Sequence, residues 1–530
     1  MIGISMSSRL LLTFCLVASA LLSGSGREVA KAMDADSESG RVRAPDFTGA
    51  SGWINTDKPV SIKDLRGQVV LLDFWTYCCI NCMHVFPDLK YLEDKYHNQP
   101  VVILGVHSGK FDEEKDADNI RAAVLRHNIM HPVAVDNEYN VWNAYAIQSW
   151  PTLVLIDPRG YVVGEVSGEG HRADLDSAIA KLLEAGRKDG TLGKPLQFQP
   201  ERAHFKSGEL EFPGKVLADK TGHRLFISDT NHHRIVITSL EGKIIDVIGS
   251  GAIGLTDGNF AEAKLHQPQG LALSSDGNTL YIADTENHAV RQADLTKKTL
   301  ITLAGTGEQS HDFHPDAPSK TTPLSSPWDL ALIGDKLYVA MAGSHQIWVI
   351  DLSSQRTSLC AGTGREGAFG DSVADAAFAQ PSGLATDGKH LYVASSEASC
   401  VQDINLADGS VRILAGSGDL FGFGSNDGVG TAARFQHPLG VALSADGKTL
   451  FLADSFNNLI RRVDVASGQV THFAGTGKSD PGTDESIGLF EPGGLSIAGD
   501  QMYVADTNHH RIVCLTIAKN LLATVLDVRR

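Results

Sequence analysis

This sequence has few cysteines, few long apolar runs and no excess of positive charge, and each of these features excludes a class of protein. Seven cysteines among 530 residues are too few for a scaffold held together by disulfides. After the N-terminal segment no apolar run reaches 18 residues, so no membrane span is expected once a signal is cleaved. Lysine and arginine number 46 against 63 aspartate and glutamate, a net charge of −17, which disfavours nucleic acid as a partner.

The composition that is present describes a globular protein of several domains. Apolar residues make up 42% and charged residues 21%, which excludes wholesale disorder. Glycine occurs 53 times without a Gly-X-Y period, which indicates many turns and excludes collagen. A length of 530 residues favours two to four domains.

The N-terminus has the architecture of a secretory signal peptide. An apolar run, Leu10–Ala20, follows Arg9 and ends in the small-residue pattern Ala18-Ser19-Ala20. Residues 1–25 are therefore predicted to be a signal peptide, and the polar, aperiodic residues 26–44 a flexible linker. The mature protein is predicted to be exported, to the periplasm or the extracellular space.

Residues 45–187 alternate between strand-like and helical patterns, which predicts an α/β layer domain. Strands are expected at 69–74, 101–106, 152–156 and 161–166, and helices at 118–127 and 173–183, with another helix starting near Cys79. Residues 188–207 are predicted to be a linker.

Three cysteines lie together in the segment 75–84, and two of them form a Cys-x-x-Cys motif at the predicted strand-to-helix junction. The free N–H groups of a helix start favour an anion, so this position favours the thiolate of Cys79. Cys82 lies one helical turn further on, within reach to attack a mixed disulfide on Cys79.

The segment Asp73-Phe74-Trp75 followed by Cys79-Ile80-Asn81-Cys82, together with Ser149-Trp150-Pro151-Thr152, resembles the thioredoxin superfamily, in particular its exported TlpA-like branch. The resemblance implies that Cys79 attacks, that Cys82 resolves and that Asp73 is the buried proton acceptor. It also implies a cis Pro151 facing the cysteines and a redox-active Cys79–Cys82 disulfide with no other cofactor. Cys78 stands where a tryptophan is usual, and with Trp75 and Trp150 it is expected to modulate the pair.

Other interpretations of the cysteines stay open. Zinc binding by Cys79 and Cys82 with Cys78 or His84 lacks a second Cys-x-x-Cys or a histidine pair, so no metal is expected. Covalent haem attachment needs histidine directly after the second cysteine, where Met83 stands instead. Thr76 lies three residues before Cys79, a spacing that resembles the one before the nucleophile of a thiol peroxidase. A purely structural domain is a further alternative.

Residues 208–530 contain six repeats. Each opens at a proline and continues into four short strand patterns, and the prolines are Pro213, Pro268, Pro327, Pro381, Pro438 and Pro492. Four strands per unit predict propeller blades, so the second domain is predicted to be an all-β propeller with six blades.

Polar strings such as Asp229–Arg234 and Asp506–Arg511 in these units resemble NHL repeats. Because such strings recur in nearly every blade, we interpret them as residues that satisfy backbone groups at tight turns. Blades three and four depart from the pattern, with Met341 and Ser395 in place of aspartate. Long glycine-rich loops, Gly416–Arg434 and Gly475–Gly488, are predicted to lie on one face and to bind a protein or peptide.

The order of signal, thioredoxin-like domain and NHL-type propeller resembles the NHL repeat-containing protein two family. The leading hypothesis is a thiol-disulfide oxidoreductase with a protein thiol or disulfide, or an electron-donor protein, as partner, and with the propeller docking that partner. The alternatives are a non-catalytic binding scaffold and a thiol peroxidase.

Overall fold

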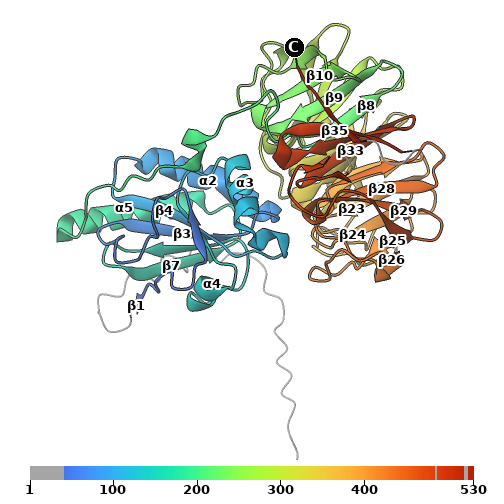
Figure 1. Cartoon of the computed structure of the whole chain (residues 1–530). Helices are drawn as coiled ribbons and strands as arrows, with labels where there is room; N and C mark the ends of the chain where they lie inside the picture. The colour runs from blue at the N-terminus through green and yellow to red at the C-terminus, as the bar shows by residue number, and fades with distance from the viewer. Residues whose placement is uncertain (1–40, 484–485, 518–522, 530) are drawn as a thin grey trace, which may run out of the picture.

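The computed structural model describes residues 41–483, 486–517 and 523–529. The predicted signal peptide and almost all of the predicted N-terminal linker lie outside the described residues. Figure 1 shows an α/β domain on the left and a ring of small sheets on the right, joined by an extended segment. Both predicted fold classes are confirmed.

The α/β domain contains a seven-stranded sheet with the order β1-β7-β6-β3-β4-β5-β2. Strand β3 pairs in parallel with β4 and antiparallel with β6, so it lies at the centre of the sheet. The strands are β1 (Val42–Arg43), β2 (Gly52–Ile54), β3 (Val69–Trp75), β4 (Val101–His107), β5 (Val133–Val135), β6 (Thr152–Ile156) and β7 (Tyr161–Ser167). The helices are α2 (Ile80–Tyr96), α3 (Ala117–Arg126), α4 (Asn140–Ala144) and α5 (Arg172–Asp189).

Helices cover both faces of this sheet, which explains why β3 is apolar almost throughout and buried along its whole length. Side chains alternate between the faces of a strand, so Val69, Leu71 and Trp75 point one way and Val70, Leu72 and Phe74 the other. The face of Leu71 packs against α2 and α5. Asp73 shares that face, because it lies two residues after Leu71, and it therefore points towards α2.

The propeller has six sheets of at least four consecutive strands, each running outward from the central channel. The innermost strands are β8 (Val216–Asp219), β13 (Pro268–Leu273), β18 (Pro327–Ile333), β22 (Pro381–Thr386), β27 (Gly440–Leu443) and β33 (Pro492–Ala498). The second strands are β9 (Arg224–Asp229), β14 (Thr279–Asp284), β19 (Lys336–Met341), β23 (His390–Ser395), β28 (Thr449–Asp454) and β34 (Gln501–Asp506). The third strands are β10 (Arg234–Ser239), β15 (Ala289–Asp294), β20 (Gln346–Asp351), β24 (Cys400–Asn405), β29 (Leu459–Asp464) and β35 (Arg511–Thr516).

The fourth strands are β11 (Ile244–Ile248), β16 (Thr299–Ala304), β21 (Arg356–Ala361), β25 (Val411–Gly416), β30 (Gln469–Ala474) and β36 (Ala523–Leu526). Three blades gain a short fifth strand at the outer edge: β12 (Gly258–Asn259), β17 (Asp316–Pro318) and β26 (Gly428–Val429). A separate hairpin consists of β31 (Gly482–Thr483) and β32 (Ser486–Ile487). The last blade supplies its own fourth strand, as predicted.

The turns between the second and third strands link each blade to the next one, through a histidine in blades one, two, three and six and through Ser399 and Asn458 in blades four and five. In blade two His288 Nδ1 accepts a hydrogen bond from Ser326 N of blade three at 3.1 Å, and Thr285 donates to the carbonyl of Pro327 at 2.7 Å. In blade six His510 Nδ1 accepts from Phe212 N of blade one at 3.0 Å. The same type of hydrogen bond therefore joins the last blade to the first and closes the ring. This supports the interpretation that these residues stabilise the turns.

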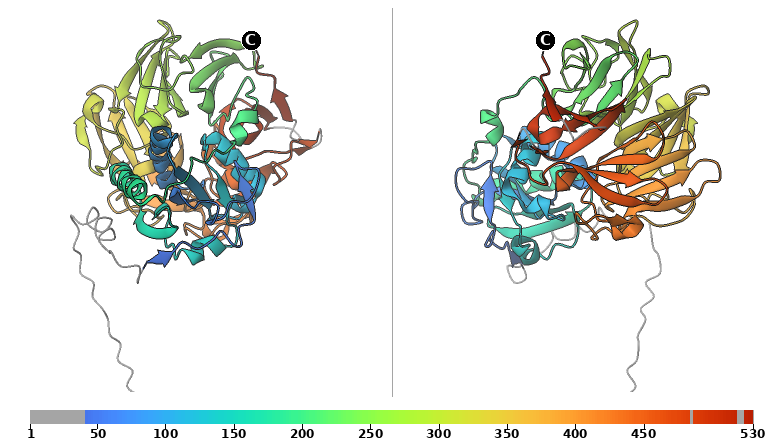
Figure 2. Two further views of the ribbon diagram at one scale, coloured as in Figure 1. Left: turned by 90° about the vertical axis from the view of Figure 1, so that its left-hand side faces the viewer. Right: turned by 45° about the vertical axis from the view of Figure 1, so that its right-hand side comes forward.

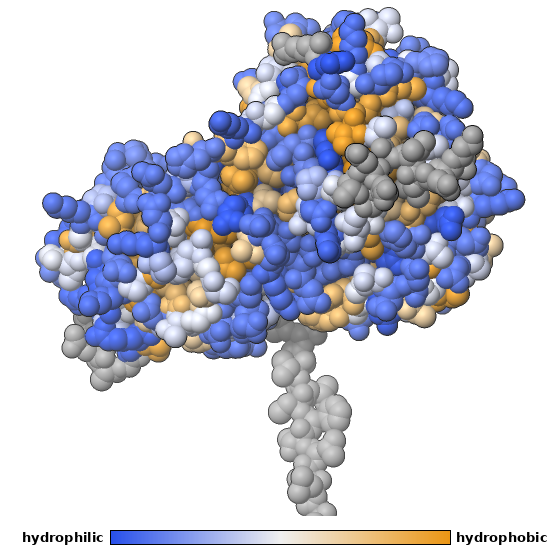
Figure 3. All heavy atoms as spheres, in the orientation of Figure 1, coloured by the Kyte–Doolittle hydropathy of each residue, from blue (hydrophilic) through white to orange (hydrophobic). Residues whose placement is uncertain are grey.

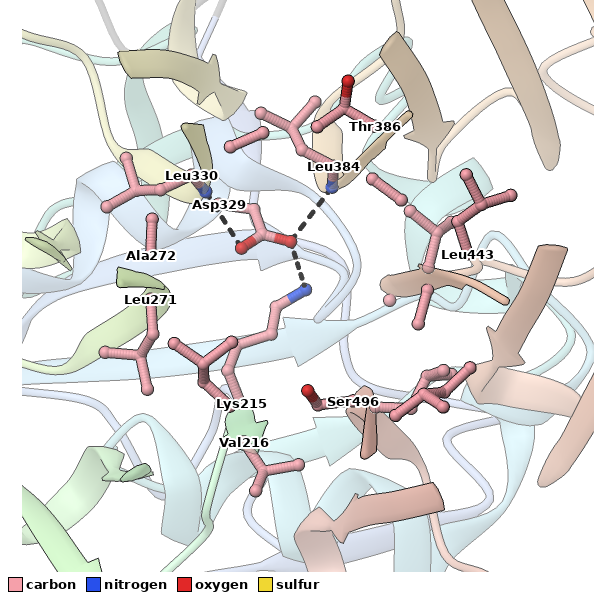
Figure 4. A pocket seen from close by; sticks show the side chains of 18 of the residues that line it. Lys215, Val216, Leu271, Ala272, Asp329, Leu330, Leu384, Thr386, Leu443 and Ser496 are labelled. Carbon is pink, nitrogen blue, oxygen red and sulfur yellow. Dashed lines mark hydrogen bonds and ion pairs between the residues drawn. The ribbon is translucent and has the colours of Figure 1, made fainter. Parts of the chain in front are cut away.

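A buried ion pair ties four blades together in the central channel (Figure 4). Lys215 Nζ lies 3.3 Å from Asp329 Oδ2 in the view of Figure 4. It also donates to the carbonyls of Ser382 at 2.7 Å and Leu439 at 2.6 Å. Asp329 also accepts from the backbone N–H of the neighbouring strand β22, at Leu384, at 3.0 Å. The pair borders a cavity of about 300 Å³ lined mainly by innermost strands.

The α/β domain packs against one face of the propeller. The left view in Figure 2 looks through the α/β domain onto the disc of blades behind it. Hydrogen bonds connect the two domains across sequence separations of 105 to 382 residues, for example from Ile80 N to Gln380 Oε1 at 2.9 Å. This packing places the cysteine segment between the domains.

Candidate functional site

The Cys-x-x-Cys motif lies where β3 passes into α2. Cys79 is the N-cap residue, with an extended backbone of φ −83° and ψ 116°. Its carbonyl accepts from Cys82 N at 3.1 Å and Met83 N at 3.2 Å, which starts the helix. Cys79 is partly exposed whereas Cys82 is buried. The geometry therefore gives the two sulfurs the unequal access that an attacking and a resolving thiol require.

Cys82 is held as a neutral thiol. Burial raises its pKa well above the ordinary value, and a hydrogen bond with the Cys79 side chain and the charge of Asp73 raise the pKa further. The Cys79 and Cys82 side chains are thus within hydrogen-bonding reach of each other. Before it attacks another sulfur, Cys82 must lose its proton to a nearby base.

Asp73 is a buried carboxylate whose charge acts on Cys82. It is 0% exposed, and neither of its carboxylate oxygens has a hydrogen-bond partner among the described residues. Burial raises its pKa from 3.8 to about 7, and the charge of His131 opposes this shift. A carboxylate that changes protonation near neutral pH beside a buried thiol is suited to proton transfer.

The remaining residues singled out in the sequence gather around the motif. Trp75 and Cys78 are buried in one apolar cluster with Cys82, and Cys79 and Trp150 pack against it. The Trp150–Pro151 peptide bond is cis. Because Thr152 pairs with Phe74, the Pro151 loop lies beside the end of β3 from which the cysteine segment departs.

Glu114 organises the turn before the motif and was not expected from the sequence. Its Oε1 accepts from Thr76 Oγ1 at 2.7 Å and Cys78 N at 2.8 Å, and its Oε2 accepts from the backbone N–H groups of Lys110 and Phe111 at 2.9 Å each. Burial raises the pKa of Glu114 to about 7. It follows β4 by several residues and belongs to no motif, so only the three-dimensional packing identifies it.

Four of the propeller residues immediately before the unit-opening prolines, Ser326, Gln380, His437 and Glu491, contact the cysteine-bearing domain. All six residues at this position have left-handed backbones, with φ between 46° and 51°: Phe212, Gln267, Ser326, Gln380, His437 and Glu491. Ser326 Oγ lies 2.8 Å from His84 Nε2, and Glu491 Oε2 lies 2.7 Å from Arg126 Nη1. Sequence reasoning did not identify these contact residues, because they differ in type from blade to blade. Their shared position before a repeated proline was the signal that could have identified them.

The glycine-rich loop 416–434 also reaches the α/β domain, on the face where binding was predicted. Phe423 of this loop lies 4.9 Å from the ring of Phe111 and packs against the cluster that contains Cys82. The other loop named in the sequence, 475–488, includes residues outside the described part of the chain. The first partner of the propeller loops is therefore the chain's own α/β domain.

Grouped metal ligands and membrane-spanning helices are absent from the described residues. Within ranges 41–483, 486–517 and 523–529, no three His, Cys, Asp or Glu residues are grouped to hold a metal ion. Across the same ranges no helix combines the length and apolarity needed to cross a membrane. On the face shown in Figure 3, hydrophilic side chains predominate and apolar ones form smaller areas on both domains.

Comparison with known proteins agrees with both domains. Residues 67–162 match a thioredoxin-like family model and residues 265–292 an NHL repeat model. The chain is 43% identical over 513 residues to Protein SUPPRESSOR OF QUENCHING 1, chloroplastic, of Arabidopsis thaliana, covering 93% of this chain and 48% of that protein. It is 40% identical over 524 residues to human NHL repeat-containing protein 2, covering 91% of this chain and 71% of that protein.

Another relative matches the α/β domain alone. The thiol-disulfide oxidoreductase ResA of Bacillus cereus is 30% identical over 136 residues, which is 25% of this chain and 76% of that protein. The chain thus spans about half the length of the plant relative, nearly three quarters of the human one, and contains a counterpart of most of ResA.

Proposed function

The chain belongs to the NHL repeat-containing protein 2 family, and from this premise we propose that it is an exported thiol-disulfide oxidoreductase whose redox pair is Cys79 and Cys82. The architecture of a thioredoxin-like domain and a propeller suits a redox protein or a binding scaffold. The observation that carries the redox proposal is the unpartnered, buried Asp73 beside two hydrogen-bonded thiols of unequal exposure.

In the proposed reaction Cys79 attacks first, because it is the more exposed sulfur. Its thiolate attacks one sulfur of a substrate disulfide, and the other substrate sulfur leaves as a thiolate that takes up a proton. Asp73 then accepts the proton of Cys82, and the Cys82 thiolate attacks Cys79 Sγ. The second substrate sulfur leaves as a thiolate and takes up the proton held by Asp73, so the substrate gains two electrons and two protons while the Cys79–Cys82 disulfide forms. The reverse sequence oxidises a substrate dithiol.

The thiol-peroxidase alternative is less favoured by the surroundings of Thr76. Its hydroxyl donates to Glu114 at 2.7 Å, so that proton is directed at a carboxylate and not at Cys79. A peroxidase would consume hydrogen peroxide at a rate that depends on Cys79, whereas we expect no such dependence.

Insulin reduction tests the redox proposal. With dithiothreitol as electron source, the wild type should accelerate the reduction of insulin disulfides, and Cys79→Ala should lower the rate to that of dithiothreitol alone. Cys514→Ser is the matched control, because Cys514 is a partly exposed cysteine of blade six and should leave the rate unchanged. Equal rates for wild type and Cys79→Ala would refute the proposal.

A non-catalytic scaffold is the second candidate, and the packing of the propeller over the cysteine segment favours it. This function predicts that Cys79→Ala preserves the protein's cellular phenotype and that deletion within the loop 416–434 abolishes it. The redox proposal predicts that Cys79→Ala abolishes the phenotype.

Export rests on the N-terminal apolar run and is tested separately. Mass spectrometry of the mature protein from cell fractions should find an N-terminus near residue 26 in the exported fraction. An intact N-terminus in the cytosol would contradict export and leave the redox proposal standing.

A further inference from the structure

Three buried polar groups of the α/β domain lie around Gly105. Gly105 of β4 pairs with Asp73 of β3 in the parallel register, so both residues belong to the face of the sheet that α2 covers. A β-carbon at Gly105 would lie 2.8 Å from Trp75 Nε1 and 3.5 Å from His131 Nε2, so both ring nitrogens lie over this glycine. The Asp73 carboxylate and these two nitrogens are buried and have no hydrogen-bond partner among the described residues.

These groups supply the hydrogen-bond partners that one buried water molecule needs. The Asp73 carboxylate accepts, the Trp75 indole N–H donates, and a histidine ring nitrogen does either. Buried polar groups in folded proteins are generally satisfied by protein or by an ordered water, which takes about two to four such partners. Because Gly105 has no side chain, the face of the sheet is open at this place.

His131 connects this buried place to the surface. Its other ring nitrogen, Nδ1, lies 2.7 Å from Glu93 Oε1 of α2. The His131 side chain is 6% exposed and that of Glu93 20%. Both residues line a cavity of about 360 Å³ between the α/β domain and the propeller. The other titratable residues that line this cavity are Lys90, His127, Arg202, His233, His266 and Glu286.

Asp73 needs such a connection in order to exchange its proton. It is 0% exposed, and its carboxyl group changes protonation near neutral pH. While Asp73 holds a proton, it cannot accept the proton of Cys82 until the first one has left. An imidazole ring suits this transfer, because it accepts a proton at one nitrogen and releases a proton from the other.

We propose that His131 is the proton relay of Asp73, and that a water molecule over Gly105 carries the proton from Asp73 to His131 Nε2 while the Nδ1 proton passes to Glu93 and on to solvent. One proton leaves Asp73, one reaches solvent, and no electrons move. Reduction of the Cys79–Cys82 disulfide draws a proton back along the same groups, which restores the starting tautomer of the ring. The inference rests on the proposed redox function.

A pH jump on the reduced full-length protein tests the relay without any substrate. The pH is raised rapidly from below to above the Asp73 pKa of about 7, and time-resolved infrared spectroscopy follows the loss of the protonated carboxyl band, assigned by its absence in Asp73→Asn. Glu114 gives an internal reference, because it is equally buried and burial raises its pKa to about 7 as well. Its band is assigned with Glu114→Gln.

His131→Ala removes the relay and opens its place to the cavity. Because positioned proton transfer contributes a factor of about 100 or more, the Asp73 band should disappear about 100-fold more slowly in this variant, and the Glu114 band at the wild-type rate. Added imidazole should restore the Asp73 rate in proportion to its concentration. His131→Gln keeps a side chain that can hydrogen-bond to Glu93 but has no ring to relay a proton, so it should be slow even if His131→Ala folds poorly.

Two further variants separate the path from general loosening of the domain. Gly105→Ala places a β-carbon against Trp75 Nε1, so it should slow Asp73 with His131 intact and should not respond to imidazole. His127→Ala is the matched control, because His127 lines the same cavity but its ring packs against Phe86, so the Asp73 rate should be unchanged.

A wild-type Asp73 rate in both His131 variants would overturn the proposal. So would an equal slowing in His127→Ala, a slowing of the Glu114 band in His131→Ala, or the absence of any response of His131→Ala to imidazole. Failure of the redox function is a distinct result: the wild type would then not accelerate insulin reduction, whatever the rates of the Asp73 band.

Discussion

Replacement of Asp73 by asparagine isolates the group on which the proposed proton transfer depends. Asparagine has nearly the same shape and cannot ionise. Burial raises the Asp73 pKa from 3.8 to about 7 in the folded protein. A pKa difference of about three units between the folded and unfolded states changes the free energy of unfolding by about 4 kcal/mol, because one pKa unit corresponds to 1.36 kcal/mol.

The sign of the stability change with pH follows from the number of protons that the folded and unfolded states bind. Between the two pKa values the folded state binds a proton at Asp73 that the unfolded state has lost, so the wild type loses stability as pH rises from about 4 to about 7. The Asp73→Asn variant cannot ionise at this position, so it does not lose stability in this way. Relative to the wild type, its free energy of unfolding should therefore increase by about 4 kcal/mol between about pH 4 and pH 8.

The assay is denaturant unfolding of the reduced protein at a series of pH values, with Asp73→Asn and wild type side by side. Single-turnover kinetics supply the second readout: the variant should form the mixed disulfide at Cys79 normally but release it about 100-fold or more slowly, since Cys82 has lost its base. The reasoning would be refuted if the stability of wild type and Asp73→Asn changed with pH in parallel, or if both released the mixed disulfide at the same rate.

Two further predictions concern the propeller. Lys215→Met leaves Asp329 buried in the channel without its cation and should cost about 3 to 5 kcal/mol of unfolding free energy, measured by denaturant titration; an unchanged midpoint would contradict a role for the pair in joining the blades. His510→Ala removes the acceptor of Phe212 N and should cost about 1 to 3 kcal/mol, as His288→Ala should at an internal blade junction. A negligible effect at His510 beside a clear one at His288 would show that the ring is closed by other contacts.

The elements that the sequence predicted well are those whose signal is local. The apolar run 69–74 became β3, which extends to Trp75, and the helix expected near Cys79 begins at Ile80. Strand β6 has its expected bounds, Thr152–Ile156. Repeated prolines likewise located the blades, because each opens an innermost strand or lies just before one.

The arrangement around the cysteines was beyond sequence reasoning because it depends on contacts between distant segments. Gln380 and Glu397 lie some 300 residues after the groups they meet, Ile80 and Lys110. Single polar side chains at variable positions carry these contacts, and no periodicity marks them. The departure of blade four from the repeat was visible in the sequence, but the ion pair that Glu397 of this blade forms with Lys110 was not.

The central claim is that Cys79 and Cys82 form one reversible disulfide. Its most direct test is to equilibrate the purified protein in dithiothreitol redox buffers and to quantify the disulfide by mass spectrometry. We expect a single two-electron transition, with the oxidised-to-reduced ratio changing tenfold per about 30 mV, in the wild type and in Cys78→Ser, and none in Cys82→Ser. The absence of a Cys79–Cys82 disulfide at every buffer potential would contradict the account.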